Sequence, residues 1–155
     1  MNDTPAATGV RPLASDYSKL VMAAEFPSTP PQTLFDYWTK PDLLTLWWPG
    51  EAETDPRVGG AYRLSWPQMG WELQGHYLEF DPPRTLGFTW QWAHQPDLPT
   101  RQVFVDFESQ GEGTHLRVTH GAYMDTEQDQ QDRQEHLEGW THFLLKLHNL
   151  LEGDA

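Results

Sequence analysis

The spacing of hydrophobic residues changes once along this chain, from a period of two to a period near 3.6. Alternating hydrophobic and polar residues, separated by turns that carry Pro or Gly, predict a series of strands. The predicted strands are Tyr17–Phe26, Glu51–Asp55, Ala61–Trp66, Trp71–Phe80, Thr85–Trp92, Arg101–Ser109 and Thr114–Gly121. Because most of the connections are too short for a crossover helix, we expect one antiparallel sheet.

Helical spacing appears in three places. Two short helices are predicted between the first and second strands, one opened by Pro30-Pro31 and one from Pro41 to Trp48 that Pro49-Gly50 ends. A long helix is predicted from Thr126 to Leu151, with Thr126 as its cap and Gly153 just beyond its end. Its apolar stripe consists of Leu137, Trp140, Leu144, Leu147 and Leu151.

The strands supply a matching apolar face, because side chains alternate between the two sides of a sheet. The predicted inward rows are Tyr62, Leu64 and Trp66; Leu86, Phe88, Trp90 and Trp92; Val103, Val105 and Phe107; and Leu116, Val118 and His120. In Trp71–Phe80 the apolar residues change parity, which predicts a bulge near Tyr77 to Glu79. A helix and a sheet that each hide one face pack together, so the fold class should be α+β.

Glycine, proline and tryptophan stand at an ordered series of points in the chain. Gly59-Gly60 permits a tight entry into a strand, Asp81-Pro82-Pro83 turns the chain, and Gly139 should let the long helix approach the sheet closely. The full series is Trp47-Trp48-Pro49-Gly50, Arg57-Val58-Gly59-Gly60, Gly75, Asp81-Pro82-Pro83, Gly113-Thr114 and Gly139-Trp140.

In this order and spacing, from about Tyr17 to Leu151, the series resembles the START-like (SRPBCC) superfamily. Within it, the chain is most similar to the family named after the activator of the heat-shock-protein-90 ATPase. The resemblance implies a helix-grip fold, in which a curved seven-strand antiparallel sheet wraps around a long C-terminal helix. It also implies a deep apolar cavity between sheet and helix, whose occupant differs among members.

Composition narrows the classes of partner. The 155 residues suffice for one domain, which we place at 17–152, after a disordered tail at 1–16. A net charge of -13 opposes binding to nucleic acid or to anionic membrane surfaces. The tail lacks the basic start and apolar run of a signal peptide, and no segment suits a membrane span, so we expect a cytoplasmic protein.

The sequence gives little indication of a metal or cofactor site. The chain has no cysteine, which excludes a thiolate nucleophile and any Cys-ligated metal. His136, His142 and His148 are six residues apart on the long helix, so their side chains point in different directions and do not share one ion. We therefore assign no metal, no cofactor and no catalytic residue.

The predicted cavity opens between the start of the long helix and the Trp47-Trp48 helix. We expect its lining to be Trp48, Tyr62, Trp66, Phe88, Trp90, Val105, His120, Tyr123, Trp140 and Phe143. His120 is the main polar candidate because the parity of its strand turns it inward. It is either a core-edge residue bonded to a backbone carbonyl or to Tyr123, or a ligand-orienting donor or proton carrier.

The acidic residues of the long helix form a further feature. We interpret Asp125, Glu127, Asp129, Asp132 and Glu135 as a solvated face that suits the helix N-terminus. The resulting hypothesis for function is the binding of a small hydrophobic or aromatic ligand, such as a lipid, sterol or polyketide, without membrane insertion. Alternatives are a co-chaperone-like module with a chaperone or homodimer partner, and an aromatase/cyclase-like enzyme.

Overall fold

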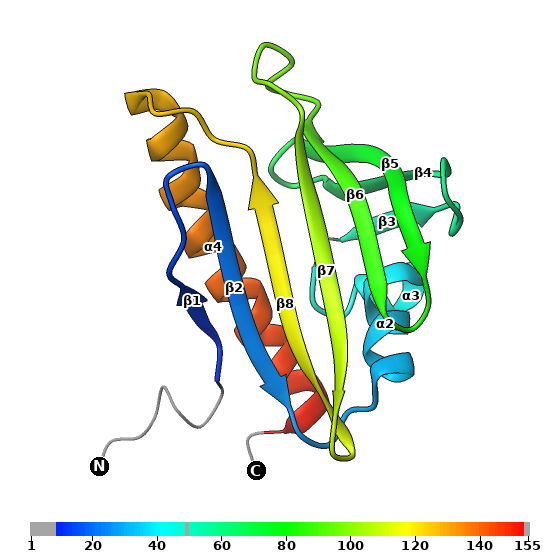
Figure 1. Ribbon diagram of the computed structural model, residues 1–155. Coiled ribbons are helices and arrows are strands. Elements are labelled where there is room, and N and C mark those ends of the chain that lie inside the picture. The colour runs from blue at the N-terminus through cyan, green and yellow to red at the C-terminus, as the bar shows by residue number, and fades with distance from the viewer. Residues whose placement is uncertain (1–8, 49, 154–155) are drawn as a thin grey trace.

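The computed structural model of the protein describes residues 9–48 and 50–153. Within them an eight-stranded antiparallel sheet has the order β1-β2-β8-β7-β6-β5-β4-β3 (Figure 1). The strands are β1 (Arg11–Leu13), β2 (Lys19–Phe26), β3 (Glu51–Thr54), β4 (Ala61–Trp66), β5 (Trp71–Asp81), β6 (Thr85–Trp92), β7 (Arg101–Gln110) and β8 (Gly113–Gly121). The helices are α2 (Pro31–Thr39), α3 (Pro41–Leu44) and α4 (Glu127–Glu152).

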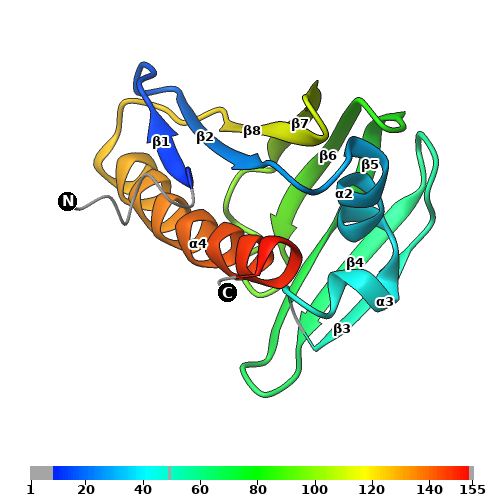
Figure 2. The ribbon, with the colours of Figure 1, turned by 90° about the horizontal axis from the view of Figure 1, so that it is seen from below.

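This architecture confirms the α+β helix-grip prediction. The sheet curves around α4, and α2 and α3 lie between β2 and β3 in the chain (Figure 2). The inward rows are buried as the alternation predicts except at Trp66 and Trp92, which are partly buried, and Val103, Val105 and Leu116 are completely covered. The register of β5 against β6 shifts between Tyr77 and Glu79, where the change of parity predicts a bulge.

The strand count differs from the prediction by one, because β1 is a short edge strand. It lies within the segment 1–16 that we expected to be a disordered tail, so that expectation is wrong for Arg11–Leu13. Arg11 pairs with Ala23 of β2 in the ladder, and its guanidinium donates to Glu25 Oε1 at 2.8 Å. Residues 1–8 of the predicted tail lie outside the described residues.

The ends of α4 follow from its sequence. Thr126 Oγ1 accepts a hydrogen bond from the Asp129 N–H at 3.1 Å, and Gly153 stands beyond the last turn with a φ of 71°. Helix α3 is shorter than predicted: it ends at Leu44, and the chain continues in turns to Trp48. Pro49, predicted to end this helix, lies outside the described residues.

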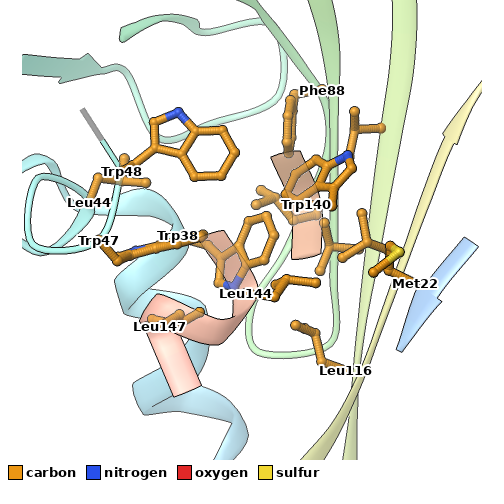
Figure 3. Packing of buried hydrophobic residues seen from close by; sticks show 14 of the residues in the cluster. Met22, Trp38, Leu44, Trp47, Trp48, Phe88, Leu116, Trp140, Leu144 and Leu147 are labelled. Atoms are coloured by element: carbon orange, nitrogen blue, oxygen red, sulfur yellow. The ribbon is translucent and has the colours of Figure 1, made fainter. Parts of the chain in front are cut away.

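The core fills the concave side of the sheet between α2, α4 and the strands. Trp38 of α2 stacks on Trp140 of α4, with ring centroids 5.8 Å apart. Leu144 and Leu147 continue the buried stripe of α4 toward its C-terminus (Figure 3). Trp38 and Trp140 therefore join α2 to α4, and Trp140 also lines the cavity described next.

Candidate functional site

A cavity of about 340 Å³ lies between α4, the ends of β4 to β6 and the β6–β7 loop. Its walls are mostly aromatic. The tryptophans and the phenylalanine of the lining are Trp48, Trp66, Trp71, Trp90, Trp92, Trp140 and Phe143. The Trp48 and Phe143 rings stack with their centroids 4.6 Å apart and their planes at 30°, and the ring centroids of Trp66 and Trp92 are 5.4 Å apart. Such a volume is near the lower end of the range for small-molecule sites, about 300 to 1,000 Å³.

One end of the cavity is polar and buried. Arg101, the first residue of β7, is 3% exposed and donates from Nη2 to Asp132 Oδ2 at 3.0 Å. Asp129 Oδ1 lies 3.5 Å from the same nitrogen, and Nη1 donates to the Ala122 carbonyl at 2.6 Å. Buried charges persist only when they are paired in this way.

A chain of rings continues from this ion pair toward the core. The Arg101 guanidinium lies over the Tyr123 ring at 4.5 Å, and Tyr123 Oη is 2.7 Å from His136 Nδ1. The His136 ring stacks on His120 at 4.4 Å, and His120 Nδ1 accepts a hydrogen bond from Trp140 Nε1 at 3.0 Å. This row of side chains therefore links the buried ion pair at Arg101 to the aromatic wall of the cavity.

Burial sets the protonation of these groups. It lowers the pKa of His136 to about 4, with Arg101 contributing in the same direction. Burial, followed by the neighbouring His136 and Arg101, holds the pKa of His120 well below its ordinary value. Burial also raises the pKa of the Tyr123 phenol. At pH 7 both imidazoles are neutral, and Tyr123 keeps its proton.

Gly139 provides part of the cavity's space. It lies inside α4 and lines the cavity, and a Cβ at this position would meet no atom within 4 Å apart from its chain neighbours and the surrounding backbone of its own helix. The prediction that Gly139 permits a close approach of helix and sheet is therefore wrong. Glycine in a helix interior costs about 1 kcal/mol relative to alanine. No close packing contact at Gly139 offsets this cost, and the absence of a side chain leaves open space.

The ten residues predicted to line the cavity fall into three groups. Trp48, Trp66, Trp90, Trp140 and Phe143 line it. Tyr62 and Phe88, again with Trp48, are among the residues that line a second, smaller hollow of about 30 Å³. Val105, His120 and Tyr123 are buried but lie outside the cavity lining.

His120 differs most from its predicted role. Its ring lies behind Trp90, His136 and Trp140, and its hydrogen-bond partner is the Trp140 indole, neither a backbone carbonyl nor Tyr123. Because Nδ1 accepts, the neutral ring carries its proton on Nε2. That buried nitrogen has no hydrogen-bond partner among the described residues. His136, on the other side of the stack, lines the cavity, as does His94 of the loop after β6.

Sequence reasoning missed much of the lining. From β6 and the loop after it come Gln91, Trp92, His94, Gln95, Leu98 and Pro99; Trp71 and Arg101 come from β5 and β7; and α4 adds Asp132, Glu135, His136 and Gly139. The expectation of a solvated acidic face is wrong for Asp129 and Asp132, which are 9% and 8% exposed. Their signal was present, because Asp129, Asp132 and His136 continue the helical spacing of Trp140 toward the N-terminus.

Metal-binding clusters and membrane-spanning helices are both absent from the described residues. No three His, Asp or Glu side chains of residues 9–48 and 50–153 gather closely enough to hold a metal ion. In the same part of the chain, no helix is both long enough and apolar enough to cross a membrane.

An antiparallel sheet that curves around one long C-terminal helix, with an aromatic cavity between them, defines the helix-grip class of START-like domains. The chain belongs to the family described as "Activator of Hsp90 ATPase homolog 1-like protein", whose model matches residues 28–152. This confirms the family to which the ordered Gly, Pro and Trp positions pointed. A search of curated proteins found no match.

Solved structures share the fold. Protein MLL2253 from Mesorhizobium loti is 28% identical, with a TM-score of 0.76 over 88% of this chain and 98% of that one. PFC0360w, described as an HSP90 activator from Plasmodium falciparum, is 23% identical, with a TM-score of 0.68 over 88% and 96%. DynU16, described as a protein of the dynemicin biosynthetic locus, is 20% identical, with a TM-score of 0.75 over 89% and 48%. For the last two, the likeness concerns the fold alone.

Proposed function

We propose that this protein binds a small aromatic or hydrophobic molecule in the cavity of about 340 Å³ beside α4. The observation that carries the proposal is Gly139. A helix that only packed against the sheet would be more stable with a side chain there, and nothing in the structure obstructs one. The empty position is explained if the space beside it is used by a ligand.

The chemistry of the walls supports the same function. Tryptophan rings give a ligand a large apolar contact, and the buried end at Arg101, Asp132 and His136 offers a few polar atoms that orient it. Membership of a family whose fold encloses a cavity agrees with this arrangement. We extend the proposal to lipid-like, sterol-like and polyketide-like aromatic ligands as the first compounds to test.

The test compares a residue that fills the cavity with one that does not. Gly139→Phe should place a ring in the cavity, whereas Gly139→Ala adds a single methyl group. Gln134→Phe adds the same ring at an exposed position of α4 and serves as the control. A thermal-shift and tryptophan-fluorescence screen on the unmodified protein would first identify ligands.

We expect Gly139→Phe to weaken binding of every hit by at least tenfold, while Gly139→Ala and Gln134→Phe bind within a few fold of the parent. Denaturant unfolding checks that Gly139→Phe remains folded. Binding that survives in a folded Gly139→Phe protein would show that the ligand lies elsewhere, and the proposal would fail.

A protein-interaction function is a second candidate, favoured by the fold shared with the Plasmodium falciparum HSP90 activator. The same variants separate the two functions. A protein partner bound through the outer surface should be insensitive to Gly139→Phe, because that side chain faces the cavity. Binding of a small molecule in the cavity should instead be lost in Gly139→Phe.

A further inference from the structure

The charged residues that line the cavity carry a net negative charge. Asp132 and Glu135 both line it, and Arg101 is the one arginine or lysine among the described lining residues. The Arg101 charge is already matched, because Nη2 lies 3.0 Å from Asp132 and 3.5 Å from Asp129. His136 adds no positive charge at pH 7, since its pKa is lowered to about 4 by burial and by Arg101.

Glu135 leaves one carboxylate uncompensated at the edge of the cavity. Its side chain is exposed and accepts a hydrogen bond from Gln131 Nε2 at 3.4 Å. None of the ion pairs among the described residues involves Glu135. A ligand that brought a second carboxylate here would meet repulsion and find no free cation, whereas a ligand ammonium would find a partner.

The aromatic walls add to this bias. Tryptophan faces attract cations more strongly than other rings do, and Trp66, Trp92 and Trp140 all line the same space. The net charge of -13 extends the negative potential beyond the cavity and favours the approach of cations. Ring faces, the unpaired carboxylate and the long-range field therefore act in the same direction.

We propose that the cavity selects aromatic ligands that carry a positively charged nitrogen over carboxylates of the same shape. This inference rests on the proposed function, since it specifies the ligand class of the same cavity. The ammonium group would lie toward Glu135, with the rings of the ligand against the tryptophans. Neutral aromatic alcohols should bind with intermediate affinity.

Three probes with the same naphthalene ring test this preference for a cation: the amine 2-(2-naphthyl)ethylamine, the alcohol 2-(2-naphthyl)ethanol and the carboxylate 2-naphthaleneacetate. Isothermal titration calorimetry at pH 7 and low salt should give at least a tenfold lower Kd for the amine than for the acetate. Added salt should narrow the difference, because part of the attraction is screened by ions. Gly139→Phe should abolish binding of the amine, and this loss would show that the amine binds in the cavity.

Two glutamates of α4 provide a matched pair of variants. Glu135 and Glu138 are both exposed, and each accepts from a glutamine four residues earlier, at 3.4 and 3.3 Å. Glu135 lines the cavity and Glu138 does not. Glu135→Gln should reduce the preference for the amine at least threefold, whereas Glu138→Gln, with the same change of net charge, should leave it unchanged.

The outcomes separate the inference from the proposed function. If the alcohol binds in a manner sensitive to Gly139→Phe but the acetate binds as tightly as the amine, the cavity is a ligand site and the charge inference is overturned. Equal effects of Glu135→Gln and Glu138→Gln would also overturn it. If none of the three probes binds, both the inference and the proposal of an aromatic-binding cavity are rejected for ligands of this size.

Discussion

Mild acid should destabilise this protein through the stacked pair His120 and His136. His120 is completely buried and His136 is partly buried, and both imidazoles are neutral in the folded state, with the pKa of His136 lowered from 6.5 to about 4 by burial. The unfolded chain binds protons at these histidines once the pH falls below about 6.5, whereas the folded protein does not, so the free energy of unfolding falls with pH. The stability is fully present above pH 6.5 and is lost between pH 6.5 and 4.

The magnitude follows from the shift. For His136 the whole shift corresponds to about 3 kcal/mol, of which about 2 kcal/mol should be lost between pH 7 and pH 5. His120, whose pKa is also lowered by burial, adds a loss in the same direction and range. Burial opposes ionisation of Glu25, but its bonds to Arg11 and His115 outweigh that effect and lower its pKa, so its contribution is lost only at lower pH.

Urea unfolding at half-unit steps from pH 7.5 to 4.5 measures this dependence. We expect the free energy of unfolding of the parent protein to fall by at least about 2 kcal/mol between pH 7 and 5. His136→Gln should start from a lower value but fall less steeply, because one titrating group has been removed. His142→Gln, at an exposed position of the same helix, should keep the parent slope. A flat profile for the parent, or the parent slope in His136→Gln, would refute the buried-neutral assignment.

Three further predictions concern stability in denaturant at pH 7. Trp140→Ala should cost about 3 to 5 kcal/mol because it opens the core, whereas Leu150→Ala, at an exposed position, should change stability by less than about 0.5 kcal/mol; equal midpoints would contradict the burial. Gly139→Ala should stabilise α4 by up to about 1 kcal/mol, while Gly113→Ala should cost about 1 to 3 kcal/mol because its Cβ would meet the backbone at the end of β2; two changes of the same sign would contradict the geometry. Arg101→Met should cost about 3 to 5 kcal/mol, since it leaves two buried carboxylates unpaired, and a loss below about 1 kcal/mol would contradict their burial.

Most of the fold could be predicted from the sequence because the elements bury one face each. Alternation placed Val103, Val105 and Leu116 correctly, and a change of parity located the bulge after Tyr77. Strand β1 could not be predicted in this way. Three residues carry no measurable period, and its structure depends on pairing with β2, a contact that local sequence does not reveal.

The cavity was predicted less well than the fold, for a physical reason. Alternation tells which residues point inward, but not which inward residues touch one another and which border empty space. Val105 and His120 point inward and are covered by other side chains, whereas His136 reaches the cavity from the helix. Gly139 was misread for the same reason, because a glycine beside a sheet signals either close contact or space.

The position of the cavity follows from a change along the buried face of α4. From Asp129 to His136 that face is polar and pairs with Arg101 and Tyr123, and from Trp140 to Leu147 it is apolar. Buried ion pairs seldom stabilise a fold more than apolar side chains of the same size would. A polar half on this face is therefore not explained by stability, and neither is a glycine at the junction of the two halves. Both features are explained if the junction receives an amphiphilic molecule, with its rings on the tryptophans and its polar end toward the N-terminal half of α4.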